Sequence, residues 1–228
     1  MTIWDSLQTV IDEARKRTLG AALAAYAERK AKRDDSAFSI ALIALSAKMA
    51  RADGDVHDAE TAAFRRFFQY PDTEEPKVRM IYNLAQQDVA GFEHYLAKVA
   101  DLFAEKPIVL EDVLDCLFYM ATADGVEHPR ERVLLDRAAA AFHISPAAFR
   151  RIRAAHFGLE ADDPWAILGV EPEAGIDGVK SAWRALARDH HPDALMARGV
   201  PAAMVKIAEA RMAAINAAYE KALAQAET

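Results

Sequence analysis

Near its C-terminal end the sequence carries His191-Pro192-Asp193, in which an imidazole and a carboxylate stand close together. A histidine beside an aspartate is a pairing that general acid and base catalysis uses. The nearest hydroxyl nucleophile, Ser181, precedes the tripeptide by about 15 Å of helical rise, which is too far for contact. We therefore expect the tripeptide to bind a partner, and we do not expect the protein to be an enzyme.

The residues before the tripeptide predict a helix with two different faces. Pro192 disfavours helical backbone at His191 and lacks an amide donor, so the helix should end there and the tripeptide should form an exposed turn. Lys180, Arg184 and Arg188 recur every four residues and should form a positive ridge that faces solvent. The opposite face should pack inward, and it comprises Val179, Ala182, Trp183, Leu186, Ala187 and His190.

Flanking segments should hold this helix in place. Asp163-Pro164 predicts the cap of a short helix over residues 164–168, and residues 201–224 have the apolar stripe of a return helix. The run from Asp163 to Val170, the helix, the tripeptide and the run from Ile215 to Glu220 together resemble a J domain of the DnaJ family. Residues 190–204 resemble the corresponding loop of DjlA-type proteins, which pair an N-terminal TerB-like helical domain with a C-terminal J domain.

This resemblance implies a co-chaperone that docks on a DnaK-type chaperone and accelerates the hydrolysis of ATP bound to that partner. The implied partner-binding residues are Lys180, Arg184, Arg188, His191, Pro192 and Asp193. The ridge would supply steering and affinity, the aspartate a charge-assisted pair with a partner cation, the histidine the orientation of the turn, and the proline its rigidity. Because Ala185 and Asp189 occupy positions where relatives often have cations, we expect a modest, salt-sensitive affinity.

An internal repeat lies earlier in the chain, where Met49 to Glu60 recurs as Met120 to Glu131. Each copy lies between two apolar helical segments, which indicates a duplicated helical hairpin and resembles the TerB fold with its acidic loops. One hypothesis is a divalent-cation site with oxygen and imidazole ligands. Its candidate ligands are Asp53, Asp55, His57, Glu60, Asp124, Glu127, His128 and Glu131. The alternative is helix capping, with Pro129 at the first helical position.

Composition and periodicity predict an all-α protein. The 228 residues are 53% hydrophobic and 28% charged, with nine glycines and nine prolines. We expect an N-terminal helical bundle with the duplicated hairpin and a small C-terminal helical hairpin. The predicted divisions are an amphipathic helical segment over residues 1–35, a TerB-like domain over 36–157, a linker over 158–162 and a J domain over 163–228.

The net charge and the cysteine content indicate which partners and which cellular compartment are expected. The net charge of -7 argues against nucleic-acid binding. Cys116, the single cysteine, lies in an apolar helical pattern and should be a buried thiol in a reducing compartment. With no apolar run of membrane-spanning length and no secretory signal pattern, a cytoplasmic protein without a transmembrane segment is expected. Residues 1–35 should fold onto the next domain, and peripheral contact with the inner face of the membrane is the alternative.

Two classes of function follow. In the first, the TerB-like domain recruits clients or partners, or regulates the J domain. In the second, the protein is a metal-sensing or stress-sensing interaction protein, resembling tellurite-resistance proteins, and the J domain is accessory. Arg150, Arg151 and Arg153 are expected to form a solvated face in either case. The sequence indicates no oligomeric state.

Overall fold

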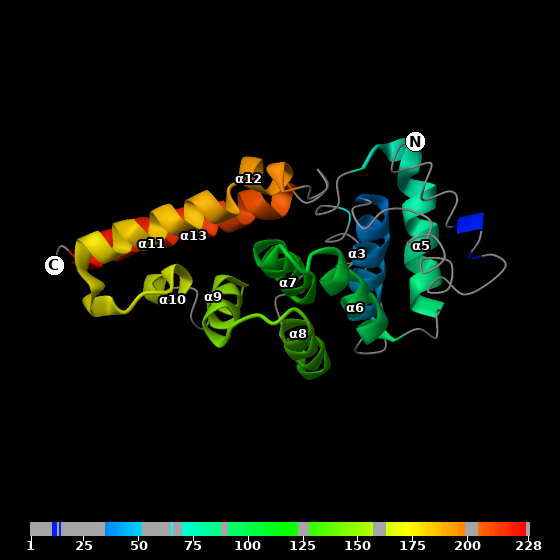
Figure 1. The fold of residues 1–228 in the computed structure, drawn as a ribbon, viewed down its shortest axis with the longest axis horizontal. Helices are drawn as coiled ribbons and strands as arrows, with labels where there is room; N and C mark the ends of the chain where they lie inside the picture. Colours follow the sequence, from blue (N-terminus) through cyan, green and yellow to red (C-terminus); the bar gives the residue numbers. More distant parts are fainter. Residues whose placement is uncertain are drawn as a thin grey trace.

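The computed structural model describes residues 35–51, 70–87, 91–122, 128–156, 163–198 and 205–226, together with residues 11, 12, 14 and 65. All regular elements in these ranges are helices, so the predicted all-α fold is confirmed. Figure 1 shows a bundle of helices from α3 to α9 beside a long hairpin of α11 and α13. The predicted linker and nearly all of the predicted N-terminal segment lie outside the described residues.

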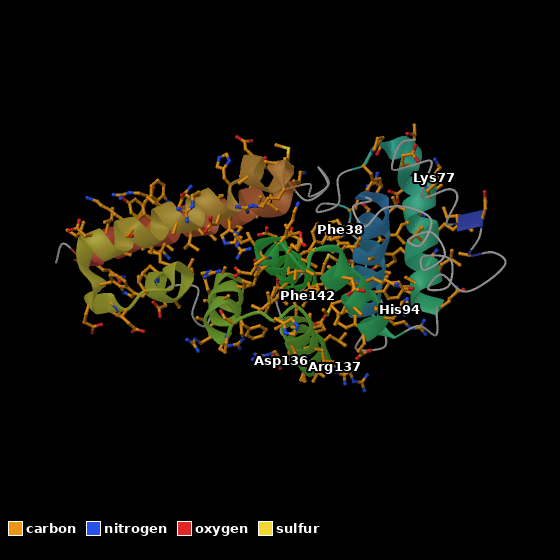
Figure 2. All side chains as sticks on the ribbon, in the orientation of Figure 1. Phe38, Lys77, His94, Asp136, Arg137 and Phe142 are labelled. Atoms are coloured by element: carbon orange, nitrogen blue, oxygen red, sulfur yellow. The ribbon has the colours of Figure 1, made fainter. Side chains whose placement is uncertain are left out.

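Helix α3 is the centre of the bundle. The bundle contains α3 (Asp35–Met49), η1 (Asp72–Glu74), α5 (Glu75–Gln87), α6 (Phe92–Leu102), α7 (Pro107–Ala121), α8 (Pro129–Ala141) and α9 (Pro146–His156). Residues 38–47 are buried, and α5, α6 and α7 pack around them. A helix that is apolar on all faces needs such neighbours. Phe38 meets Phe103 edge to face with ring centroids 4.8 Å apart. Figure 2 shows Phe38 and Phe142 inside the bundle and Arg137 at its outer edge.

Helix α7 contacts α3, α8 and α9 and carries charged residues into the interior. Asp112 and Asp115 are buried among its apolar neighbours. The neighbouring Cys116 is also buried, as predicted. Burial, and then the negative charge of Asp115, raise the pKa of the Cys116 thiol, which makes it a poor nucleophile.

The C-terminal hairpin brings two long helices side by side (Figure 1). It comprises α10 (Pro164–Leu168), η2 (Pro172–Ala174), α11 (Gly175–His190), α12 (Pro192–Ala197) and α13 (Val205–Ala226). Asp163 caps α10, since its carboxylate accepts hydrogen bonds from the backbone N–H groups of Trp165 (2.9 Å) and Ala166 (3.3 Å). The helix ends at Gly169, whose φ of 70° is left-handed and favours glycine. The cap that Asp163-Pro164 predicts is therefore present.

The inner face of α11 packs against α10 and α13 largely as its periodicity predicts. Val179 and Leu186 are buried with Ile215 of α13. Trp183 is only partly buried and lies at the edge of this core. Its ring stacks on Tyr219 at a centroid distance of 4.8 Å, and its indole N–H donates to Oδ1 of Asn216 at 2.9 Å. These contacts fix α11 and α13 relative to each other.

The hairpin and the bundle share their apolar cores. Ala154 of α9 is buried in the core of the hairpin. In the other direction, Leu195 of α12 and Ala208 of α13 are buried in the core of the bundle. The hairpin is therefore packed on the bundle at two places, beside α9 and beside α7.

Asp115 on α7 is held by groups from two other helices. Its Oδ1 is hydrogen-bonded to Nε2 of His156 on α9 at 2.8 Å. Burial alone would raise the pKa of Asp115, but the charges of Arg211 and His156 and the hydrogen bond from His156 outweigh burial and lower it. Because the folded-state pKa is below that of an unfolded aspartate, the carboxylate stabilises the fold above the unfolded pKa. This stabilisation is lost as the pH falls through the folded-state pKa.

We expect Asp115→Asn to lower the free energy of unfolding at neutral pH by roughly 3 kcal/mol, because it removes the charge of a buried carboxylate beside a buried cation. The deficit should shrink on acidification, because the wild type protonates the same carboxyl. Urea unfolding from about pH 7 down to about pH 3 measures both effects. Asp101→Asn, at an exposed position of α6, is the matched control. A deficit that is the same at every pH would contradict this account.

Candidate functional site

The tripeptide His191-Pro192-Asp193 forms the junction between α11 and α12. His191 is the C-cap of α11 and also the N-cap of α12, with extended backbone angles (φ -62°, ψ 140°). Its Nδ1 accepts a hydrogen bond from the backbone N–H of Asp193 at 3.2 Å, and Pro192 occupies the first position of α12. The side chains of His191 and Asp193 are 53% and 81% exposed. The turn is thus exposed, as predicted, while the short helix α12 that follows it was not predicted.

The cations of α11 lie on the outer side of the hairpin, but they are not equally available. Arg184 and Arg188 are exposed and Lys180 is half-buried. Nε of Arg188 contacts Oδ1 of Asp189 at 3.1 Å, and this hydrogen bond and the charge of Asp189 raise the pKa of Arg188. Among the described residues, no carboxylate pairs with Arg184. Asp189 therefore offsets part of the positive charge of the ridge.

The last residue of α11, His190, contacts the bundle. It was predicted to lie on the inner face of the helix and it is buried, with its partner on α7. Nδ1 of His190 is hydrogen-bonded to Oδ1 of Asp112 at 3.1 Å. The same oxygen accepts a hydrogen bond from Nη1 of Arg211 on α13 at 2.7 Å. One carboxylate oxygen of the bundle therefore binds both long helices of the hairpin.

Further charged side chains extend this contact into a network. The network consists of Glu111, Asp112, Arg151, His190 and Arg211, and the charge of Arg211 also acts on Asp115, which pairs with His156. Oε2 of Glu111 lies 2.5 Å from Nη2 of Arg151 and 3.5 Å from Nη2 of Arg211. The prediction that Arg151 belongs to a solvated face is wrong, because this side chain is 19% exposed and lies against Glu111.

The sequence does contain an indication of this network. Three acidic residues interrupt the otherwise apolar pattern of α7, and Arg211 occupies a position of the apolar stripe that includes Ala208 and Ile215. Charged residues are seldom buried unless they are paired. The acids in α7 and the arginine in α13 carry opposite charges, so together they could have suggested that α7 and α13 meet.

A second attachment lies on the far side of the turn. Arg198, which ends α12, donates a hydrogen bond from Nη1 to the backbone carbonyl of Asp189. The backbone carbonyl of Arg198 accepts a hydrogen bond from Nζ of Lys106, which precedes α7. Between these contacts, Leu195 is buried in the bundle core. The exposed turn therefore lies between two places where the hairpin is bonded to the bundle.

The proposed metal ligands are only partly within the described residues. Asp53, Asp55, His57, Glu60, Asp124 and Glu127 lie outside them. His128 and Glu131 form a capping box at the start of α8, so the capping interpretation is confirmed for these two residues. Nδ1 of His128 accepts from the N–H of Arg130 at 3.3 Å, and Oε2 of Glu131 accepts from the N–H of His128 at 3.4 Å. Metal binding stays a prediction.

Two further features are absent from the described residues. Within them, no group of three or more histidine, cysteine, aspartate or glutamate side chains is arranged to hold a metal ion. None of the helices in the described ranges is both long enough and apolar enough to cross a membrane.

Comparison with known proteins identifies the family of the chain. Residues 39–154 match the family described as tellurite resistance protein TerB. The co-chaperone protein DjlA of Photobacterium profundum is 26% identical over 92% of this chain and 86% of its own length. The DjlA proteins of Vibrio cholerae and Escherichia coli are 32% and 31% identical over 49% and 47% of this chain.

The last two matches cover 50% and 48% of those relatives, so the matched region is about half of their length. No solved structure is significantly similar to the chain. The TerB match spans slightly more than half of the chain, and the DjlA match extends over nearly all of it. The chain therefore belongs to the DjlA-type family, and residues 39–154 are its TerB domain.

Proposed function

We propose that this protein is a co-chaperone that docks on a DnaK-type chaperone and stimulates the hydrolysis of ATP bound to that chaperone. The observation that supports this proposal is the exposed turn of His191, Pro192 and Asp193 at the end of the helix that carries the cations. The names of the DjlA relatives, which are co-chaperone proteins, agree with it. The nucleotide site belongs to the partner, and this chain acts on the reaction by binding.

The chemistry of the turn suits recognition of a cation on the partner. The carboxylate of Asp193 is 81% exposed, so it can form a charge-assisted hydrogen bond with little loss of existing contacts. Pro192 restricts the backbone of the turn, and the bond from the N–H of Asp193 to His191 orients the imidazole. A pre-formed turn loses little conformational entropy when it binds.

The cations of α11 supply the second part of the interaction. Arg184 and Arg188 extend along the exposed side of the helix that leads to the turn, and an acidic partner surface would be attracted to them. Such exposed charges chiefly raise the association rate, and salt screens them. Binding accelerates hydrolysis only if it favours the hydrolysis-competent state of the partner over its other states. We assign that selection to the turn and the steering to the cations.

The TerB-like domain has two roles in this proposal. Its bundle supports the hairpin, and its remaining surface is available to recruit clients or other partners. Peripheral contact with a membrane through residues 1–35 remains a prediction, as does a cytoplasmic location.

We expect His191→Gln to abolish stimulation in a single-turnover ATPase assay with a DnaK-type chaperone, because glutamine cannot reproduce the imidazole that bonds the N–H of Asp193. His143→Asn is the matched control: this histidine is exposed in the bundle, and asparagine tolerates its positive φ of 55°. Absence of stimulation by the wild type, or full stimulation by His191→Gln, would rule out the proposed function.

If the ridge steers the partner, removing a positive charge and removing a negative charge should change the half-saturating concentration in opposite directions. Arg184→Ala should raise the half-saturating concentration about threefold at low salt, and Asp189→Asn should lower it about threefold, because each changes the ridge by one unit of charge. Both effects should shrink as salt is added. Titration of the stimulation at two ionic strengths measures them, and Arg137→Ala on α8 is the control for loss of an exposed arginine. Effects of the same sign in the two variants, or effects that do not shrink with added salt, would show that the ridge does not steer.

A further inference from the structure

The turn that docks is bonded to the bundle immediately before it begins. His190 precedes the tripeptide directly, and its side chain is 3% exposed. Its ring nitrogen Nδ1 lies 3.1 Å from Oδ1 of Asp112, which is also 3% exposed. Arg211 of α13 reaches the same oxygen at 2.7 Å. The orientation of the end of α11 therefore depends on a carboxylate of the TerB-like bundle.

The turn is bonded to the bundle again shortly after it ends. Lys106 donates to the backbone carbonyl of Arg198, and Arg198 in turn donates to the backbone carbonyl of Asp189. Leu195, between the turn and Arg198, is 3% exposed within the bundle core. The end of α12 is therefore bonded back to α11, which precedes the turn, and is also bonded to the bundle.

These contacts include directional hydrogen bonds as well as apolar packing, and only the hydrogen bonds can fix the orientation of the turn. Apolar burial is non-directional, so the packing of Leu195 does not by itself fix the orientation of the turn. Hydrogen bonds have strict geometry, and an arginine and a histidine that share one carboxylate oxygen restrict two helices at once. Buried ion pairs add little net stability, but they can specify one arrangement over others.

We propose that the TerB-like bundle positions the docking turn, and that His190, held by Asp112, is a positioning residue for stimulation of the partner ATPase. This proposal rests on the proposed function and adds a role for the bundle within it. The bundle determines how the turn is presented, while the exposed residues of the turn and the ridge make the contact with the partner.

Positioning of the turn and docking affinity affect two different quantities in a titration, the maximal stimulation and the half-saturating concentration. If the network positions the turn, its loss should lower the maximal stimulation, because complexes form but present the turn in several orientations. The half-saturating concentration should change little, because Arg184 and the rest of the ridge remain exposed. A variant that was merely less folded would need a higher concentration but would still reach full stimulation at saturation.

The test uses the full chain with two variants and one control. Asp112→Asn removes the charge that His190 and Arg211 share. Lys106→Met removes the bond to Arg198 from a half-buried position and disturbs no buried ion, so it should fold even if Asp112→Asn does not. Asp101→Asn, on the exposed surface of α6, is the control. We expect about fivefold lower maximal stimulation with Asp112→Asn, a smaller loss with Lys106→Met, and no loss with the control.

Hydrogen exchange of the same variants gives a readout without the partner. The backbone N–H groups of Leu195 and Arg198 are bonded within α12 and should exchange faster in both variants, while those in the second half of α7 should not. Full maximal stimulation or unchanged exchange in α12 for both variants would overturn the proposal. If the wild type does not stimulate the partner, the proposed function fails, and the exchange measurement still decides whether the bundle positions the turn.

Discussion

The carboxylate of Asp112 is the contact on which the arrangement of this protein depends. It is buried in a mostly apolar helix, where an unpaired negative charge would be strongly unfavourable. Its Oδ1 is compensated by Arg211 and His190, which come from the two long helices of the hairpin. The bundle can bury this charge only when the hairpin is in place. Packing of the hairpin on the bundle and compensation of the charge of Asp112 are therefore one event.

The parts of the fold that rest on local sequence could be predicted. The cap at Asp163, the end of α11 at His191 and the capping box of His128 and Glu131 each depend on residues within one helical turn. The inner stripe of α11 follows from helical periodicity in the same way. For these features the spacing of residue types along the chain is sufficient information.

The network could not be predicted with the same reasoning. Asp112 is 78 residues from His190 and 99 residues from Arg211, and no local pattern states which helices will meet. Taken alone, each residue of the network also had an ordinary explanation. His190 fitted the inner face of its helix, and Arg151 fitted a solvated face. The acids of α7 and Arg211 of α13 indicate that these two helices could meet, but only the arrangement in space shows which residues pair. The exposed turn was predictable, whereas what holds it was not.

The shared oxygen of Asp112 has an evolutionary consequence. A hairpin grafted from a relative onto this bundle would bring its own residues to the positions of His190 and Arg211, and the buried acid would be left uncompensated unless they matched. The reverse exchange would leave a buried guanidinium without an anion. The two halves are consequently not interchangeable parts, and descendants of this chain should inherit these three positions together or replace them together.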